Sequence, residues 1–154
     1  MATARQNAVE KLSANALALG EAGLLIRGEP GAGKSGLTHA LLSHARGTGR
    51  FGRLVGDDRI EIESCNGRLI ARCHAAIRGM IELRSQGIVT LPFEPAVVVS
   101  HVIDLLPPAE VLRYPETGGL EVQICGAKLP RLALPIGRSS YDCALSVLAW
   151  LGRG

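Results

Sequence analysis

The sequence reads Gly28–Glu29–Pro30–Gly31–Ala32–Gly33–Lys34–Ser35, and no other segment constrains the architecture as strongly. It fits the pattern G-x-x-x-x-G-K-[ST] at every position, which is the pattern of a loop that wraps the phosphates of a nucleotide. The glycines let the backbone turn so that successive N–H groups point at phosphate oxygens. The helix that follows such a loop adds its positive N-terminal end.

The flanking residues supply the context that this loop needs. Gly23–Arg27 is a compact apolar run typical of a buried strand, and Lys34–Ala45 has the apolar spacing of a helix. In such a setting the lysine reaches the β- and γ-phosphates, and the serine hydroxyl binds Mg²⁺. We therefore predict ATP and Mg²⁺ as ligands, although a P-loop alone does not distinguish kinases from ATPases or GTPases. The predicted nucleotide-binding residues are Gly28, Glu29, Pro30, Gly31, Ala32, Gly33, Lys34, Ser35 and Gly36.

The rest of the chain predicts an α/β fold with added antiparallel strands, because strands and helices interleave early and strands dominate later. Asn66–Gly67 is a strong hairpin turn signal. The expected strands are Asn15–Leu19, Arg53–Val55, Ile60–Ile62, Arg68–Ala71, Ala96–Ile103, Glu121–Ile124 and Lys128–Leu134. A last helix is expected from a cap at Ser139 or Ser140 to Leu151, with Leu145, Leu148 and Leu151 on one side. The polar residues 1–12 are expected to be a helix or a frayed end.

Two adjacent acids, Asp57 and Asp58, come directly after the strand Arg53–Val55. P-loop proteins place a second metal contact at an acid that ends a strand. Neighbouring residues of an extended backbone point in different directions, so one acid can face Mg²⁺ while the other faces an acceptor hydroxyl. The alternative is an ordinary solvated turn, where aspartate is common. The presence of the P-loop favours the functional interpretation.

A third carboxylate, Glu82, lies in the segment Gly79–Val89. If this segment is a strand, Glu82 and Arg84 share one face, with Ile81 and Leu83 on the other. An acid beside an arginine would hold metal and neutralise charge near a triphosphate. The spacing supports a surface ion pair on an edge strand equally well.

Composition sets the broad class. The 154 residues suit one domain, and 47% hydrophobic residues are enough for a core. The net charge of +3, without a dense basic run or interleaved aromatics, argues against nucleic acid. We find no signal peptide and no run long enough to span a membrane. The four cysteines form no CxxC pair, which is typical of reduced thiols and indicates a cytoplasmic protein.

Taken in order, these segments resemble the HPr kinase/phosphorylase family, specifically its catalytic domain. Leu54–Arg59 is similar to the family's "LVADD" segment, Ile81–Val89 to its "LEIRGLGII" signature, and Pro135–Ser139 to its "PGRN" stretch. The resemblance runs from about Ser13 to Leu151 and is closest to the short type found in alphaproteobacteria. It implies a single P-loop kinase-like domain over residues 1–154, related to the phosphoenolpyruvate carboxykinase-type fold. That fold has a mixed sheet and additional antiparallel strands. The resemblance also implies that the N-terminal domain of full-length members is absent.

The resemblance also implies an activity: transfer of a phosphoryl group from ATP to a serine of the phosphocarrier protein HPr, and its reversal by phosphorolysis. Asp58 would be the general base, and the acid in reverse, while Lys34 binds phosphate. Ser35 and Glu82 would hold Mg²⁺ with Asp57 nearby, and Arg138 would stabilise charge on the transferring group. The implied partners are HPr, the nucleotide and further copies of the chain, since family members assemble as hexamers.

Four positions depart from the family pattern. Ser13 stands where the family carries a histidine, and Ser85, Gln86 and Ser139 replace a glycine, a leucine and an asparagine. These departures leave open whether phosphorolysis is retained. They also motivate two other hypotheses: a nucleotide-sensing interaction module with little catalysis, and a small-molecule kinase on the same scaffold. The nucleotide preference and the effectors stay open as well.

Overall fold

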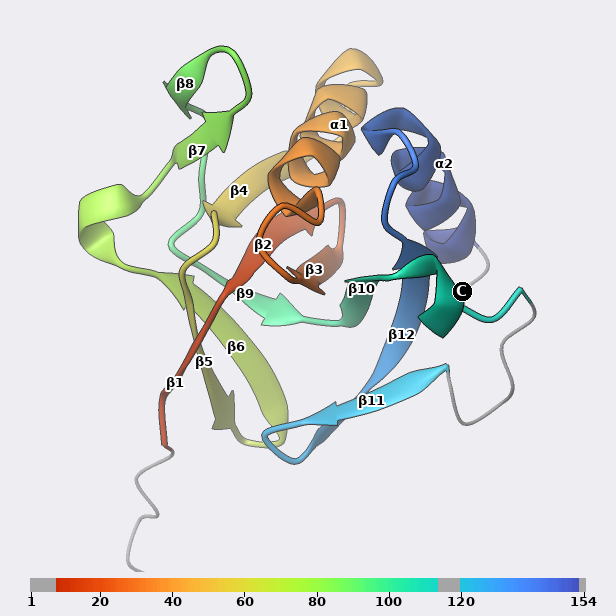
Figure 1. Ribbon diagram of the computed structural model, residues 1–154. Coiled ribbons are helices and arrows are strands. Elements are labelled where there is room, and N and C mark those ends of the chain that lie inside the picture. The colour runs from red at the N-terminus through yellow and green to blue at the C-terminus, as the bar shows by residue number, and fades with distance from the viewer. Residues whose placement is uncertain (1–7, 114–119, 153–154) are drawn as a thin grey trace, which may run out of the picture.

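The computed structural model describes residues 8–113 and 120–152, and they form three layers (Figure 1). Two helices cover one face of a central six-stranded sheet, and a four-stranded sheet covers the other. The helices are α1 (Lys34–Gly47) and α2 (Ser140–Leu151). Among the described residues, neither helix nor any other has the length and apolar character needed to cross a membrane. The mixed α/β architecture predicted from the sequence is confirmed.

The six-stranded sheet carries the P-loop. Its order is β11 (Glu121–Ile124), β12 (Ala127–Pro135), β10 (His101–Leu106), β3 (Ala22–Gly28), β2 (Ala14–Leu19) and β4 (Gly52–Gly56). The strands β12, β10 and β3 are parallel, whereas β2 is antiparallel to both β3 and β4. Because β3 and β4 run in the same direction, the P-loop after β3 and the acidic turn after β4 leave the same edge of the sheet.

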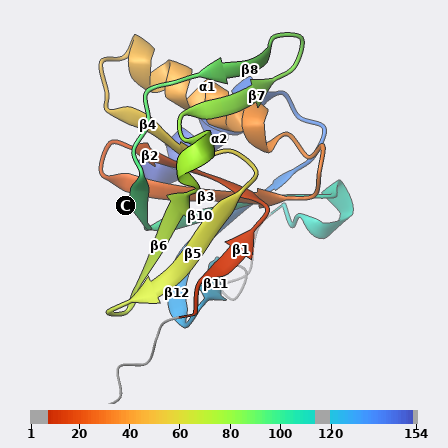
Figure 2. The ribbon, with the colours of Figure 1, turned by 90° about the vertical axis from the view of Figure 1, so that its left-hand side faces the viewer.

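The second sheet and a separate hairpin frame this edge. The four-stranded sheet has the order β1 (Glu10–Leu12), β5 (Ile60–Cys65), β6 (Arg68–Cys73) and β9 (Ala96–Val99). Asn66 and Gly67 make the β5–β6 turn with positive φ, as the sequence predicts. The hairpin consists of β7 (Met80–Leu83) and β8 (Gly87–Thr90), and short 3₁₀ turns occur at η1 (Ala75–Ile77) and η2 (Pro108–Glu110). Figure 2 shows the hairpin beside α1, above the four-stranded sheet.

Apolar side chains fill both interfaces of the central sheet. On the helix side, Leu37 and Leu41 of α1 pack against Leu24 and Ile26 of β3. On the opposite side, Leu25 joins residues of the four-stranded sheet in a second cluster. The strand β2 is fully buried because it lies in the middle layer, and this accounts for its apolar character apart from Asn15.

Two predicted boundaries are wrong. The run Ala96–Ile103 is not one strand, because the chain passes from β9 in one sheet to β10 in the other at Ser100. There the N–H of Ser100 donates to the carbonyl oxygen of Gly23, and the Ser100 hydroxyl oxygen accepts from the N–H of Gly23. The expected helix or frayed end is also wrong for Glu10–Leu12, which pairs with β5, while residues 1–7 lie outside the described residues.

The last helix begins as predicted, with Ser139 Oγ accepting from Asp142 N at 3.1 Å, but its buried face differs. It buries Cys143, Ala144 and Val147. Leu148 and Leu151 are partly buried against the same cluster, as predicted, but Leu145 is 46% exposed. The start of α2 lies close to the N-terminus of α1. A Cβ added to Gly36 would come within 2.5 Å of the Ser140 hydroxyl.

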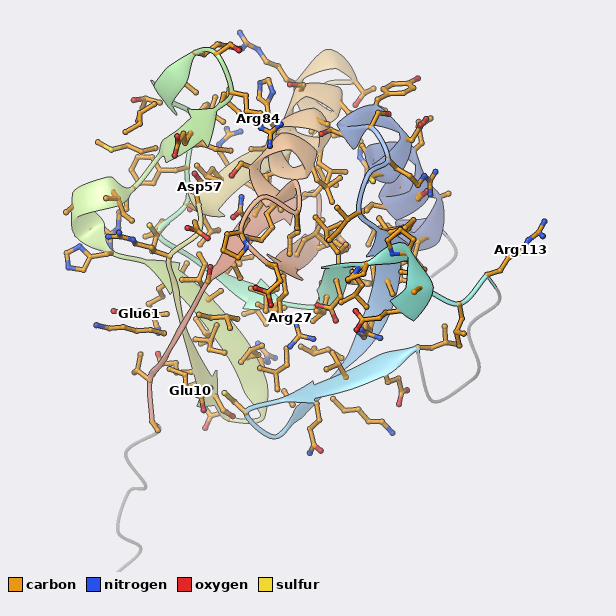
Figure 3. The ribbon with its side chains drawn as sticks, in the orientation of Figure 1. Glu10, Arg27, Asp57, Glu61, Arg84 and Arg113 are labelled. Carbon is orange, nitrogen blue, oxygen red and sulfur yellow. The ribbon has the colours of Figure 1, made fainter. Side chains whose placement is uncertain are left out.

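A buried ion cluster joins three neighbouring strands on the face of the sheet away from the helices (Figure 3). Asp104 of β10 accepts from Arg27 of β3 at 2.7 and 2.8 Å and from Arg131 of β12 at 2.5 Å. Burial alone would raise the pKa of Asp104. The hydrogen bonds and charges of the two arginines outweigh that effect, and the pKa lies below its ordinary value.

We expect Gly23→Ala to destabilise the fold by about 2 kcal/mol, because overpacking a closed contact costs about 1–3 kcal/mol. A Cβ at Gly23 would lie 2.0 Å from the carbonyl oxygen of Val98. Gly47→Ala is the matched control, since a Cβ there meets no atom within 4 Å. Chemical denaturation measures both, and equal stability of the two variants would contradict the expectation.

Asp104→Asn tests the ion cluster. We expect a loss of about 2 kcal/mol at neutral pH, below the 3–5 kcal/mol of a fully buried pair because both arginines are partly exposed. Since folding lowers the pKa of Asp104, its stabilisation is present above the unfolded value of about 3.9 and is lost as the pH falls through the folded pKa. The stability difference between wild type and variant should therefore shrink on acidification. Glu121→Gln, in an exposed pair with Lys128, should change stability by less than about 1 kcal/mol.

Candidate active site

The loop between β3 and α1 forms an open backbone cradle. Gly31 and Gly33 have φ values of 81° and 106°, in the region that favours glycine. A Cβ at either position would meet no atom within 4 Å, so the space above the loop is free. Among the described residues, no side chain caps the N-terminus of α1, and no acid lies in its first turn. The loop thus presents the positive helix end to an anion.

The side chain of Lys34 contacts the backbone of this loop. Its side chain is only 7% exposed, and Nζ donates to the carbonyl oxygens of Gly28 at 2.7 Å and Glu29 at 3.4 Å. Nζ also lies 3.7 Å from Oδ1 of Asp58. This places the one buried ammonium group of the described residues at the junction of the P-loop and the acidic turn.

Asp57 points toward the start of α1. Its Oδ1 accepts from Ser35 Oγ at 2.5 Å, and its Oδ2 accepts from the backbone N–H of Glu82 at 3.0 Å. The carboxylate therefore connects the P-loop helix to the β7–β8 hairpin. Together, the Ser35 hydroxyl and the Asp57 carboxylate offer the hard oxygen ligands that Mg²⁺ prefers.

A buried asparagine supports this arrangement, and the sequence analysis missed it. Asn15 of β2 is fully buried, and Nδ2 donates to Asp57 Oδ1 at 2.9 Å and to Thr38 Oγ1 at 3.0 Å. Its Oδ1 accepts from the N–H of Asp58 at 2.9 Å. Thr38 in turn donates to the carbonyl of Lys34 at 2.8 Å. The available signal was one amide in an otherwise apolar strand, since a buried polar group needs partners.

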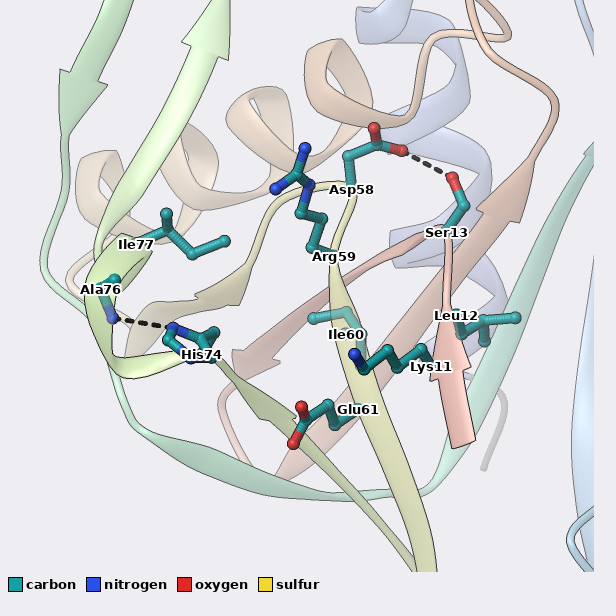
Figure 4. Close-up of a pocket in the computed structure, with 10 residues that line it drawn as sticks. All are labelled: Lys11, Leu12, Ser13, Asp58, Arg59, Ile60, Glu61, His74, Ala76 and Ile77. Atoms are coloured by element: carbon teal, nitrogen blue, oxygen red, sulfur yellow. Dashed lines mark hydrogen bonds between the residues drawn. The ribbon is translucent and has the colours of Figure 1, made fainter. Parts of the chain in front are cut away.

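Asp58 points away from Asp57, toward the opposite side of the turn. Its φ of 61° is left-handed, a conformation that aspartate adopts more readily than most residues. Oδ1 accepts from Ser13 Oγ at 2.7 Å, as Figure 4 shows, and the side chain is 61% exposed. The two adjacent acids thus face different surroundings, as expected from the sequence.

Glu82 and Arg84 do not share a strand face. Ile81 and Leu83 are buried and Glu82 is exposed, as the predicted alternation requires, but β7 ends at Leu83. Arg84, which is labelled in Figure 3, lies in the turn that follows β7. The backbone of Glu82 contacts Asp57, which places this residue beside the P-loop helix.

Arg138 and Gly36 lie on the α2 side of the cradle. Arg138 is exposed and lines a small cavity together with Ala32 and Gly33 of the P-loop. Gly36 faces Ser140 of α2, so its small size lets the two helices approach. The structure therefore brings the predicted residues around one loop, Arg138 from one side and the acids from the other.

The residues fit a magnesium nucleotide by their chemistry: an open glycine cradle, a buried ammonium group and a hydroxyl–carboxylate pair. Within residues 8–113 and 120–152, no group of three or more His, Cys, Asp or Glu side chains gathers as a metal cluster by itself. The P-loop proteins complete such a site with the hydroxyl of the P-loop and with phosphate oxygens.

The solved structure of the Hpr(Ser) kinase/phosphatase from Coxiella burnetii is similar to this chain. The two share 27% sequence identity with a TM-score of 0.76, over 94% of this chain and 95% of the other. The HPr kinase/phosphorylase of Clostridium tetani is 37% identical over 70 residues, or 46% of this chain. That of Mycoplasma mycoides is 36% identical over 66 residues, or 43% of this chain. The matched stretches span 21% and 19% of the length of these two relatives.

The family comparison covers most of the chain. The family model described as "HPr Serine kinase C-terminal domain" matches residues 6–142, a range that contains the P-loop, the acidic turn, the β7–β8 hairpin and Arg138. Because this range exceeds half of the sequence, the chain belongs to the HPr serine kinase C-terminal domain family.

Proposed function

We propose that this protein is an ATP- and Mg²⁺-dependent kinase that phosphorylates a serine of the phosphocarrier protein HPr in the cytoplasm. The observation that carries the proposal is the position of Asp58. Its carboxylate lies 3.7 Å from the ammonium of the P-loop lysine and already accepts a hydrogen bond from a serine hydroxyl at 2.7 Å. Phosphoryl transfer requires a base in this place, between the phosphate donor and the acceptor hydroxyl.

We infer the role of each residue in this reaction from its position in the site. The backbone of residues 28–33 and the ammonium of Lys34 bind and orient the phosphates of ATP. Asp58 accepts the proton of the serine hydroxyl while the serine oxygen forms its bond to the γ-phosphorus and the bond to ADP breaks. Arg138 is the cation on the other side of the cradle and neutralises charge on the transferring group.

Ser35 and Asp57, with Glu82 beside them, are the residues that would hold Mg²⁺. The ion, when bound, neutralises the phosphate oxygens. The hydrogen bonds from Asn15 and from the backbone of Glu82 fix the Asp57 carboxylate in its orientation toward Ser35. Supporting bonds of this kind commonly preorganise metal ligands.

We also assign the fold to the P-loop kinases related to the phosphoenolpyruvate carboxykinase type. The support is the order strand, glycine loop, helix over β3 and α1, with the parallel strand β10 beside β3. In phosphorolysis, the phosphoryl group of phosphorylated HPr would pass to inorganic phosphate and form pyrophosphate, while Asp58 returns the proton to the serine oxygen.

Mass spectrometry of purified HPr, incubated with this protein, ATP and Mg²⁺, tests the proposal. We expect one added phosphoryl group on a serine, and a parallel incubation of phosphorylated HPr with inorganic phosphate measures the reverse reaction. ATP binding without any modification of HPr would contradict the proposal and favour a nucleotide-sensing module. ATP consumption with a metabolite in the absence of HPr would favour a small-molecule kinase.

Lys34→Met should weaken Mg²⁺–ATP binding by about 10- to 100-fold, since a hydrogen bond to a charged group contributes about 1.5–3 kcal/mol. Methionine keeps most of the length of the lysine side chain without its charge. Lys128→Met is the matched control, because Lys128 is exposed on β12. Isothermal calorimetry measures both affinities, and equal affinities would exclude Lys34 from phosphate binding.

Asp58→Asn should lower the rate of HPr phosphorylation by about 10²–10⁴-fold, the usual contribution of a general base. The amide keeps the shape of the carboxylate but cannot take up the proton, so the affinity for ATP should stay close to that of wild type. Glu21→Gln, in the exposed β2–β3 turn, provides a control carboxylate. If Asp58→Asn retains full activity, Asp58 is not the base.

A further inference from the structure

We propose that Ser13 is itself a phosphoryl acceptor: without another substrate, the protein transfers a phosphoryl group from ATP to the hydroxyl of its own Ser13. The inference rests on the proposed kinase activity and adds a modification site to it. Ser13 lies between β1 and β2, and its hydroxyl contacts the proposed base, Asp58.

One carboxylate oxygen connects the Ser13 hydroxyl to the phosphate side of the site. Oδ1 of Asp58 accepts from Ser13 Oγ at 2.7 Å, and the same oxygen lies 3.7 Å from Nζ of Lys34. A general base must lie within hydrogen-bond reach of the proton that it removes, and the Ser13–Asp58 distance meets this requirement. Because the lysine of a P-loop reaches the β- and γ-phosphates, the γ-phosphate of bound ATP would lie close to this hydroxyl.

Strand pairing fixes the backbone on both sides of Ser13. Leu12 pairs with β5, and Ala14 pairs with Arg27 of β3. Arg27 directly precedes Gly28, the first residue of the P-loop, so this pairing brings Ser13 level with the start of the phosphate cradle. A hydroxyl that is already held beside the reacting groups loses little entropy in the transition state, which favours transfer within one chain.

The Ser13 hydroxyl is accessible, and the space beside it can hold a phosphoryl group. Ser13 and Asp58 are both exposed, and they line an open pocket with a volume of about 500 Å³ (Figure 4). Lys11 and Arg59 bring two positive charges to the lining of this pocket, against one further carboxylate from Glu61. A phosphoserine carries a charge of about −1.5 to −2 at pH 7, so the two cations would stabilise the modified residue.

The reaction at Ser13 is the same displacement that the proposed function requires. The Ser13 oxygen forms a bond to the γ-phosphorus of ATP, the bond from that phosphorus to the oxygen shared with the β-phosphate breaks, and ADP leaves. Asp58 takes up the proton of the hydroxyl. The product has no hydroxyl left at this position, so each chain accepts a single phosphoryl group there.

Mass spectrometry of the purified protein, incubated with ATP and Mg²⁺ but without HPr, tests the inference. We expect one added phosphoryl group, and peptide mapping should place it on Ser13. Since the hydroxyl and the base belong to the same chain, the first-order rate constant should stay the same when the protein is diluted about tenfold. A rate constant that falls in proportion to the protein concentration would contradict transfer within one chain.

Substitutions of Ser13 and of its base identify the acceptor. Ser13→Ala should abolish the modification but bind Mg²⁺–ATP as wild type does in calorimetry, whereas Ser13→Thr retains a hydroxyl and should restore the modification at this position. Asp58→Asn should slow the transfer by about 10²–10⁴-fold, the usual contribution of a general base. Ser64→Ala is the matched control, because Ser64 is a half-buried serine of β5 outside the pocket, and this variant should be modified like wild type.

A parallel incubation with HPr separates this inference from the proposed function. Wild-type protein that phosphorylates HPr but never modifies itself, or a modification that persists in Ser13→Ala, would overturn the Ser13 assignment and leave the kinase proposal intact. Modification of Ser13 without any phosphorylation of HPr would support the assignment and remove HPr as the substrate. If neither protein is modified, both proposals fail.

Discussion

The buried amide of Asn15 is the contact on which the geometry of the site depends. Its three hydrogen bonds reach the helix after the P-loop, the side chain of Asp57 and the backbone of Asp58. Leaving a buried polar group unpaired costs about 1–3 kcal/mol. A rearrangement that moves the acidic turn away from the helix would break hydrogen bonds of Asn15 and would be destabilised by about this amount. The fold therefore holds the acids beside the P-loop before any nucleotide arrives.

The same asparagine helps to orient the carboxylates of Asp57 and Asp58 in different directions. The N–H of Asp58 is tied to Asn15 with its φ in the left-handed region, which reverses the chain immediately after Asp57. One carboxylate then faces the helix and the Ser35 hydroxyl, and the other faces Ser13 and the open pocket. A left-handed backbone at one residue thus places the proposed cation ligand and the proposed base on opposite sides of a single turn.

A structural feature could be predicted from the sequence where the contacts that determine it are local along the chain. The strand and the helix on either side of residues 28–33, the Asn66–Gly67 turn and the Ser139 cap follow from short-range geometry, and they form where they were predicted. The break at Ser100 was hidden, because an unbroken apolar run looks the same whether it stays in one sheet or passes to another. The role of Asn15 was hidden for a related reason: its partners lie 23, 42 and 43 residues away in sequence.

Ser13 shows how a departure from the family pattern changes the chemistry around a retained carboxylate. The resemblance places a histidine at this position, and a histidine gains a charge in the physiological pH range. A serine hydroxyl stays neutral throughout that range, and here it donates a hydrogen bond to Asp58. The orientation of the proposed base is therefore independent of the protonation of its neighbour. The cation that faces this carboxylate is Lys34, whose ammonium group also donates to the carbonyl oxygen of Gly28 in the P-loop.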